Sequence, residues 1–345
     1  MRILHISVAG IVDKFYLPFL LKVKSVLDAE QTIYIPYKEG DCTKKELEII
    51  DCYKEANIQP IVLPIKNRSD RILYYKKIRK YLKKLEERIS IKEFHIIHAH
   101  SLYSDGGVAY LINRKYGIPY IVAVRATDIV VFMKYFRHLD NLGRNIIKHA
   151  SKVIFITPSL KYATLKALYK NNGTILENGH STIIPNGINE YWIRNIRKNA
   201  KQLEDNKKIK LIQISRLKEQ KNVDKTIKAV DILRKKGLDI TLDIVGEGKE
   251  RENLESLTYS LGLINHIKFH GYITDLNKLQ ELFSKNNIFV LPSSGETFGL
   301  TYIEAMSQGL PIIGIKKTGV SDFFHNGMVG YFIDYPDPMQ IASAV

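Results

Sequence analysis

Short apolar runs alternate with amphipathic segments along the whole chain. The apolar runs have the length of buried strands, and segments between them, such as 17–27 and 223–235, carry apolar residues at helical spacing. Strands that alternate with helices predict parallel sheets covered on both faces. The runs form two series, so we expect an α/β protein with two doubly wound, Rossmann-like domains. The first series lies at 2–8, 31–36, 60–64, 94–99, 119–124 and 152–157, and the second at 209–214, 241–245, 266–270, 287–291, 311–315 and 330–333.

A polar stretch rich in Lys and Asn, 194–208, separates the two series. We therefore expect an N-terminal domain over 1–187, a linker over 188–208 and a C-terminal domain over 209–345. A length of 345 residues suits two domains of ordinary size. The sequence shows no fixed-period repeat and no low-complexity tract, which excludes solenoid and disordered classes.

The segment 287–309 carries the clearest chemical signal in the chain. It reads as a buried strand, a turn of small residues, and a helix that starts after Phe298 and ends at Gly309. The N–H groups of Phe298, Gly299, Leu300 and Thr301 would point out of the helix start. A helix start carries partial positive charge and suits a phosphate or diphosphate.

Two carboxylates accompany this anion site. Glu296 lies in the turn, and Glu304 lies about two helical turns further along. A carboxylate beside an anion is unfavourable unless it binds something else, and sugar hydroxyls are good donors to it. The arrangement therefore fits a sugar joined to a diphosphate. The alternative is that both glutamates belong to an ordinary solvated helix face.

The two glutamates, separated by seven residues, resemble the E-x7-E signature of the retaining glycosyltransferases of family 4, which have the GT-B fold. Four further segments resemble motifs of the same family in the same order. The resemblance implies two facing Rossmann-like domains and a nucleotide-sugar donor, with the nucleotide on the C-terminal side. These segments read IIPNGIN at 183–189, SRLKEQKN at 215–222, VGEG at 245–248 and FHGYI at 269–273.

The resemblance assigns a role to each donor-side residue. Arg216 and Lys221 would hold the diphosphate, although exposed surface charge is the usual reading of such residues. Glu296 would bind the donor sugar and Glu304 the ribose. The sequence contains no Asp-x-Asp pair, so no metal is required on the diphosphate, and we expect no cofactor beyond a nucleotide-diphosphate sugar with UDP as the nucleotide. The remaining donor-side positions are Gly10, Gly246, Tyr272, Ile273 and the helix start at Phe298, Gly299, Leu300 and Thr301.

The N-terminal half carries a weaker signal. Arg125 stands where many relatives have a histidine beside the reacting sugar, and Asp128 matches their acidic position. Arg125 is always charged and cannot shuttle a proton, so it would hold an acceptor group or support the sugar. His98 and His100 share one strand face and could ligate zinc, yet no Cys or carboxylate nearby completes the set, and a core or acceptor-side role for His100 is favoured.

A segment that is both aromatic and basic follows at 131–138. Lys134 and Arg137 are candidate acceptor-binding residues in it. The alternative is that the segment is helix core.

The net charge of +16 is unevenly distributed, since residues 1–187 carry +13 and residues 188–345 carry +3. The basic excess is densest at 68–88, which also has apolar residues at helical spacing. This amphipathic helix would either dock on an anionic membrane surface or pack against its own domain. A nucleic-acid partner is disfavoured because no recognition motif accompanies the charge.

The sequence gives little sign of disulfide bonds, of a secretory signal or of a membrane-spanning segment. Cys42 and Cys52 are the only cysteines, which gives neither a disulfide framework nor a zinc spacing. The start of the chain reads as a strand and not as a secretory signal. No run of about 18 apolar residues exists. We therefore expect a cytoplasmic protein, peripheral on the inner face of the plasma membrane.

The sequence thus favours a metal-independent retaining hexosyltransferase that acts on a glycan or lipid-linked acceptor in bacterial surface-polysaccharide assembly. A nucleotide-sugar epimerase of the same architecture would need acid/base carboxylates, for which Asp105 and Asp128 are the candidates. A non-catalytic glycan-binding or scaffold protein is a third possibility. An NAD-dependent oxidoreductase is disfavoured, since Arg251 stands at the third glycine of its fingerprint. The family usually has further C-terminal helices, so we expect that either the chain is truncated near Val345 or the protein dispenses with those helices.

Overall fold

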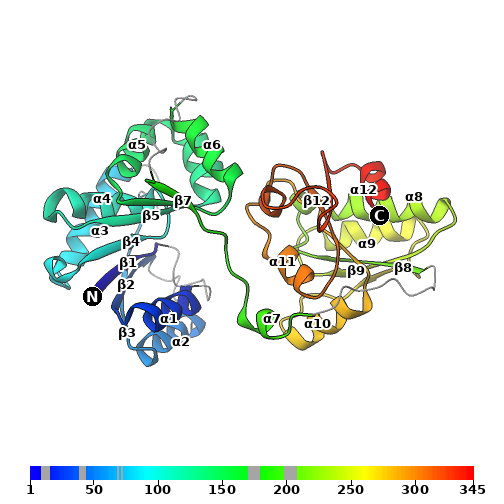
Figure 1. The fold of residues 1–345 in the computed structure, drawn as a ribbon, viewed down its shortest axis with the longest axis horizontal. Helices are drawn as coiled ribbons and strands as arrows, with labels where there is room; N and C mark the ends of the chain where they lie inside the picture. The colour runs from blue at the N-terminus through cyan, green and yellow to red at the C-terminus, as the bar shows by residue number, and fades with distance from the viewer. Residues whose placement is uncertain (9–15, 39–43, 68–69, 71–72, 170–178, 198–207) are drawn as a thin grey trace. The chain divides into compact units, whose positions relative to one another are not determined.

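The computed structural model describes residues 1–8, 16–38, 44–67, 70, 73–169, 179–197 and 208–345. It divides into two compact units, Met1–Ile184 and Pro185–Val345 (Figure 1). The positions of Gly10 and Cys42 lie outside the described residues. The two units are described in turn.

The N-terminal unit contains a sheet of seven parallel strands in the order β3-β2-β1-β4-β5-β6-β7. Six of them correspond to the first series of apolar runs, and β7 is a three-residue strand that the pattern did not show. The strands are β1 Arg2–Ile6, β2 Glu30–Lys38, β3 Ile58–Lys66, β4 Ile96–Ala99, β5 Tyr120–Val124, β6 Lys152–Phe155 and β7 Ser181–Ile183.

Helices cover both faces of this sheet. On one face, Leu20 of α1 and Tyr53 of α2 pack on Ile33 and Ile35. On the other, the hydroxyl of Tyr34 donates to a carbonyl oxygen of α3. The helices are α1 Tyr16–Leu27, α2 Lys44–Glu55, α3 Tyr74–Glu86, α4 Ser104–Tyr116, α5 Asp140–His149 and α6 Pro158–Tyr169, with short 3-10 turns at Ile91–Glu93 and Arg137–Leu139 and a π-helix at Asp128–Met133.

Helix α3 is the basic amphipathic segment of the sequence. Its apolar stripe is buried within its own unit, including Tyr74, Ile78 and Leu85. Its outward face carries Lys76, Arg79 and Lys83. The stripe is therefore used for packing, and the face left to solvent is cationic.

The C-terminal unit contains a sheet of six parallel strands in the order β10-β9-β8-β11-β12-β13. All six correspond to the second series of apolar runs. The strands are β8 Lys208–Ile214, β9 Asp239–Val245, β10 Ile267–Phe269, β11 Ile288–Val290, β12 Ile312–Ile315 and β13 Gly330–Ile333. The helices are α7 Glu190–Arg194, α8 Val223–Lys235, α9 Arg251–Ser260, α10 Leu276–Lys285, α11 Leu300–Ser307 and α12 Pro338–Ala344, with 3-10 turns at Glu219–Lys221 and Gly319–Asp322.

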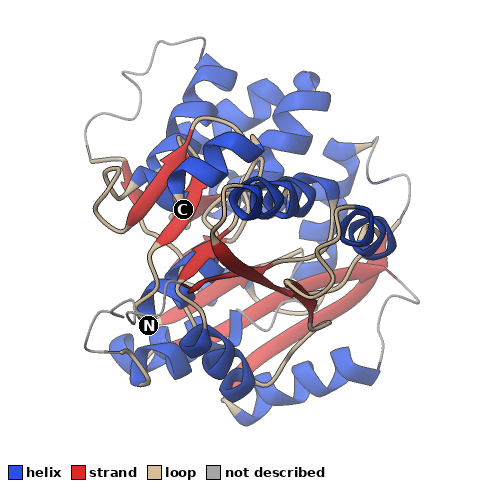
Figure 2. Cartoon of the chain, turned by 90° about the vertical axis from the view of Figure 1, so that its right-hand side faces the viewer, coloured by secondary structure: helices blue, strands red, loops and turns tan. Residues whose placement is uncertain are grey.

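Two apolar cores lie on opposite faces of the C-terminal sheet. Successive strand residues alternate between them: Leu211 belongs to the core beneath α8, α9 and α12, whereas Ile212 belongs to the core beneath α7, α10 and α11. Figure 2 shows the helices flanking the strands. Each sheet thus has helices on both faces, which confirms the predicted doubly wound architecture in each unit.

The stretch 188–208, which the sequence suggests as a linker, takes part in the second unit. Helix α7 lies within it, and Trp192 of α7 is fully buried in the core with Phe283 and Phe289. Residues 198–207 of this stretch lie outside the described residues. Residues 188–194 are therefore part of the C-terminal core and not a free connection.

The strand order of each sheet reverses at one place. In the N-terminal sheet this is between β1 and β4, and in the C-terminal sheet between β8 and β11. Ligands of open parallel sheets bind at the carboxyl ends of the strands at this reversal. None of the described helices is both long enough and apolar enough to cross a membrane.

Candidate active site

Two loops meet at the strand reversal of the C-terminal sheet. One follows β8 and the other follows β11. Asn222, which adopts a left-handed backbone conformation with φ 50°, donates its side-chain amide to Pro292 O at 2.6 Å and to Ser294 Oγ at 3.0 Å. The backbone N–H of Ser294 returns a bond to Gln220 O at 2.8 Å. These bonds fix the two loops against each other.

The paired loops bring Lys221 and Glu296 into contact. Lys221 Nζ lies 2.6 Å from Glu296 Oε2, and the side chains are 25% and 17% exposed. A further bond from Gln213 Nε2 to Lys221 O, 3.0 Å long, anchors the lysine from inside the sheet. The sequence-predicted cation and sugar-binding carboxylate therefore form one half-buried pair.

The start of α11 lies directly after Glu296. Gly299 precedes the helix with φ 78°, and a Cβ at this position would lie 2.5 Å from the ring of Tyr302. A glycine is therefore required at the turn. The N–H groups of Phe298, Gly299, Leu300 and Thr301 have no acceptor among the described residues. Unpaired N–H groups at a helix start are the kind of group that can bind an anion, and the anion-binding role of these four stays a prediction.

Gly319 supports this end from a neighbouring loop. It has φ 56°, and a Cβ here would lie 2.7 Å from Phe298 O. Thr318 and Ser321 form a capping box that holds the loop in place. Sequence analysis missed Gly319. The only signal for it was a glycine just beyond a buried strand.

Glu304 lies on α11 and is largely buried. Burial raises the pKa of its carboxyl group, and the nearby indole N–H of Trp192 opposes that shift. Trp192 Nε1 is buried and makes no hydrogen bond of ordinary geometry. The indole N–H therefore acts on the Glu304 carboxylate electrostatically and not through a hydrogen bond of normal geometry. Sequence analysis missed Trp192, which is the only tryptophan of the chain.

The turns after β8, β9 and β10 are joined by backbone bonds. Gly246 N donates to Gly271 O at 2.8 Å, and Ser215 N donates to Val245 O at 3.0 Å. Gly246 has φ 136°, and a Cβ there would lie only 1.8 Å from Ser215 O. Beyond them Tyr272 is 75% exposed. This edge offers backbone and an exposed ring to a ligand, as the sequence predicts for a base.

Arg216 and Ile273 complete the predicted donor residues. Arg216 is exposed, and its guanidinium has no partner among the described residues. Ile273 is half-buried and packs on the core that contains Trp192. Arg216 is thus a free cation on the loop that carries Lys221, within the described part of the chain.

The carboxylate of Asp128 is used inside the N-terminal unit. It is 1% exposed and accepts N–H bonds from Leu102 at 3.0 Å, Tyr103 at 3.3 Å and Arg125 at 2.8 Å. Burial raises its pKa to about 6, against the effect of these bonds. Asp128 therefore joins the turns after β4 and β5 through hydrogen bonds, and one of these bonds holds the backbone of Arg125 in place. Arg125 Nε donates to His100 O at 3.0 Å.

A second buried carboxylate, Asp105, holds the end of β1. It accepts the N–H of Val8 at 2.9 Å, and the amine of Lys66 donates to Val8 O. Burial raises the pKa of Asp105 to about 7. Nearby, Lys77 is buried with its pKa lowered to about 8, and its amine donates to Ser104 Oγ at 2.9 Å. Asp105 and Lys66 thus hold Val8, just after β1, through its backbone N–H and carbonyl groups.

The predicted acceptor residues are dispersed. His100 is buried, whereas Lys134 and Arg137 are exposed. Arg137 pairs with Asp140 at 3.0 Å. Phe132, from the same segment, stacks on Tyr103 with ring centroids 4.8 Å apart. The segment 131–138 thus combines an aromatic packing contact with an outward basic face.

Sequence comparison covers both units. The family model described as "Glycosyltransferase Family 4" matches residues 38–191. The family model described as "Glycosyl transferases group 1" matches residues 195–345. This chain belongs to the group 1 glycosyltransferases of family 4. Its two parallel-sheet units have the GT-B fold, as the sequence predicts.

Relatives of this glycosyltransferase include the N-acetyl-alpha-D-glucosaminyl L-malate synthase of Bacillus anthracis, 28% identical over 75% of this chain and 66% of that protein. The GtfA subunit of a UDP-N-acetylglucosamine–peptide N-acetylglucosaminyltransferase of Streptococcus agalactiae is 34% identical over 42% of this chain and 28% of the relative. The chain therefore spans less than two thirds of the length of these relatives. Anabaena Alr3699/HepE in complex with UDP has the same fold, with a TM-score of 0.73 and 17% identity over 99% of this chain and 88% of that one.

In this glycosyltransferase the tertiary structure joins residues that the sequence presents separately. It brings together Lys221, Glu296 and the start of α11, and it adds Gln213, Trp192 and Gly319 as supports. A glutamine between Ile212 and Ile214, inside an apolar strand run, is the sequence signal that would have revealed Gln213, and the structure shows that it is buried. Gly10 falls outside the described residues, so its predicted role stays a prediction.

Proposed function

We propose that the protein is a retaining, metal-independent hexosyltransferase that uses a UDP-sugar as its donor. The observation that carries the proposal is the Lys221–Glu296 contact beside the unpaired N–H groups at the start of α11. A diphosphate needs cations and N–H donors, and a sugar needs a carboxylate that accepts its hydroxyls. Both requirements meet at one strand reversal.

The mechanism follows from charge. When the glycosidic bond breaks, negative charge develops on the departing nucleotide diphosphate. Arg216, Lys221 and the N–H groups at 299–301 stabilise that charge. Electrostatic stabilisation of this kind is often the largest contribution to the rate enhancement of an enzyme. Glu296 holds donor-sugar hydroxyls and stabilises the positive charge on the sugar. Glu304 binds the ribose, while Tyr272 and Ile273 border the base.

Retention follows from attack on the same face as the departing group. In this route the acceptor oxygen bonds to the sugar carbon while the carbon–oxygen bond to the diphosphate breaks. The acceptor proton passes to a diphosphate oxygen. Arg125, His100, Lys134 and Arg137 are proposed to hold the acceptor, with Asp128 positioning Arg125. Because several of these groups are cationic, the acceptor we propose is an acidic or lipid-linked glycan of a bacterial surface polysaccharide.

An anionic membrane surface is the proposed docking partner of α3. Since its apolar stripe is buried, attachment would be electrostatic, through Lys76, Arg79 and Lys83, and not by insertion. We propose that the enzyme acts at the cytoplasmic face of the membrane.

The epimerase alternative needs two carboxylates that reach a sugar. Asp105 and Asp128 are the candidates, and both are buried and bonded to backbone N–H groups. The geometry therefore favours transfer over epimerisation.

A donor panel tests the proposal. UDP-, GDP- and ADP-sugars are added singly, and thermal shift and slow donor hydrolysis are measured. We expect stabilisation by a UDP-sugar and release of free hexose with retained configuration. Stabilisation by NAD, or by no nucleotide sugar, would contradict the proposal, and the latter result would favour a scaffold.

A further inference from the structure

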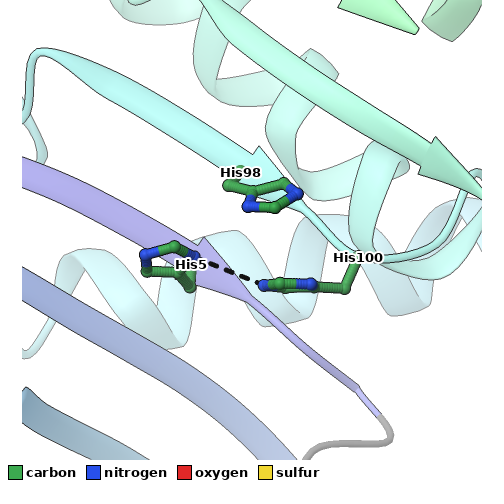
Figure 3. A group of neighbouring side chains, drawn as sticks. All are labelled: His5, His98 and His100. Carbon is green, nitrogen blue, oxygen red and sulfur yellow. Dashed lines mark hydrogen bonds between the residues drawn. The ribbon is translucent and has the colours of Figure 1, made fainter. Parts of the chain in front are cut away.

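We propose that His5, His98 and His100 form a binding site for one divalent transition-metal ion, with zinc as the ion that fits best. The three histidines all belong to the N-terminal unit, and none of them is a proposed donor-binding residue, although His100 is also proposed to hold the acceptor. Figure 3 shows one ring nitrogen of each histidine turned toward a common space. The inference goes beyond the proposed transfer reaction and does not depend on it.

The sheet register creates the cluster. His5 of β1 pairs directly with His98 of β4, across the strand reversal. His100 follows two residues after His98, so it lies on the same face. Candidate ligand nitrogens of the three residues all lie within 4.8 Å of one another. Sequence analysis saw only the His98–His100 pair, because the third histidine comes from a distant strand.

The hydrogen-bond network fixes the tautomer of His5. Gln31 Nε2 donates to Leu20 O at 2.9 Å, which turns Gln31 Oε1 toward His5 Nε2 at 3.1 Å. Because that oxygen can only accept, His5 Nε2 carries the proton and Nδ1 presents a lone pair. A ligand histidine whose other nitrogen donates to an oxygen is the usual arrangement in metal sites.

The distances fit a zinc ion after a small closure. Zinc–nitrogen bonds of about 2.0–2.1 Å in a tetrahedron place ligand nitrogens about 3.3–3.4 Å apart. His5 Nδ1 and His100 Nε2 are already 3.3 Å apart. Three histidines would leave one position for water. Imidazole ligands suit zinc, copper, nickel and cobalt, and exclude calcium and magnesium.

The three histidine side chains are buried and lie among aromatic rings. Phe19 packs edge-on against all three rings, and Tyr16 packs edge-on against His100. Burial lowers the pKa of His5 to about 4 and shifts those of the other two in the same direction. Unprotonated imidazole is the form that binds a metal.

Two features of the cluster determine how the proposal is tested. The His5–His100 contact can instead be a simple hydrogen bond between a protonated and an unprotonated nitrogen. The positive charge of Arg125 also lies close enough to lower the pKa of His98 and His100. Since that charge repels a cation, Arg125→Gln should tighten metal binding, whereas it should not strengthen a bond between two neutral rings.

The experiment uses the full chain, dialysed against a chelator and titrated with Zn²⁺ by calorimetry and with Co²⁺ by visible absorption. We expect one ion per chain and the intense absorption of four-coordinate Co²⁺. His98→Gln should abolish the absorption, and Gln31→Leu should weaken binding about 10–100-fold. His95→Ala, at an exposed histidine, is the matched control and should leave both unchanged.

Absence of stoichiometric binding would overturn the proposal. So would Co²⁺ absorption that persists in His98→Gln. Circular dichroism of each variant establishes that the chain is folded, and Arg125→Gln gives a result that misfolding cannot produce, because it predicts a gain in affinity.

Discussion

Lys221 Nζ lies 2.6 Å from Glu296 Oε2, so the proposed diphosphate cation and the proposed sugar-binding carboxylate neutralise each other when no donor is present. The pair is half-buried, and a donor that arrives must take over both charges. The diphosphate would replace Glu296 as the partner of Lys221, and sugar hydroxyls would replace Lys221 as partners of Glu296. The contact therefore holds each side chain near the position that it would use.

The two members of the pair should behave differently when mutated. Glu296→Gln removes charge that stabilises the sugar cation, so we expect kcat to fall about 10²–10³-fold with a smaller change in donor affinity. Lys221→Met leaves an unpaired carboxylate beside the diphosphate, so we expect donor affinity to fall at least about tenfold. Steady-state kinetics and calorimetry with the donor measure the two effects.

Lys228→Met is the matched control for Lys221→Met, since Lys228 also pairs with a carboxylate, that of Asp224. It should leave donor affinity unchanged. Full turnover in Glu296→Gln would contradict the role assigned to this carboxylate.

Trp192 should report on donor binding. It is the only tryptophan of the chain, and its buried indole faces Glu304, the proposed ribose ligand. Binding of UDP should change its fluorescence because the charge and hydrogen bonds of Glu304 change. Trp192→Phe keeps the packing but removes the N–H, so we expect UDP affinity to fall a few-fold with little loss of stability. An indole signal that does not respond to saturating UDP would place the ribose elsewhere.

Gly246 should tolerate no side chain. A Cβ there would lie 1.8 Å from Ser215 O, so Gly246→Ala must displace backbone, at a cost of about 2–4 kcal/mol in the free energy of unfolding. Gly262 also has a positive φ, 69°, but a Cβ there meets open space. Gly262→Ala should therefore cost only about 1 kcal/mol. Urea unfolding measures the free energy of unfolding of both variants. An equal loss in the two variants would mean that the turns after β8 and β9 are not in close contact.

Asp105 should make stability depend on pH. Burial raises its pKa from 3.8 to about 7, so the unfolded chain loses this proton at lower pH than the folded one. The contribution of Asp105 to the free energy of unfolding therefore falls as the pH rises from 4 to 7, by up to about 1.4 kcal/mol per pH unit. Above pH 7 this contribution is constant. Asp105→Asn should remove this trend. Chemical unfolding of both proteins between pH 4 and 8 measures the difference, and a difference independent of pH would contradict the shift.

The outward face of α3 should control membrane attachment. Lys76, Arg79 and Lys83 changed together to Gln should weaken binding to anionic vesicles at low salt, by about 1 kcal/mol per charge. The same substitution at Lys236, Lys268 and Lys278, which are exposed in the C-terminal unit, is a control of equal charge. Vesicle sedimentation separates the two variants. Equal loss in both would indicate a nonspecific effect of net charge.

Local features of the sequence suffice for much of this protein. The alternation of apolar runs predicts twelve of the thirteen strands among the described residues and both doubly wound sheets, because strand and helix periodicity are properties of neighbouring residues. The turn before α11, with Glu296 and Gly299, is predictable for the same reason. A three-residue strand such as β7 carries too little pattern to detect.

Contacts between distant segments were decided only by the tertiary structure. Asp128 looks like a reacting group in the sequence, but the fold directs its carboxylate into three backbone N–H groups. His5 is an ordinary strand residue until the pairing of β1 with β4 places it against His98 and His100. Trp192 falls in a predicted linker, yet packing brings its indole to Glu304. The sequence alone thus specifies which elements form, while strand order and packing determine which side chains meet, because those contacts join residues that no local pattern relates.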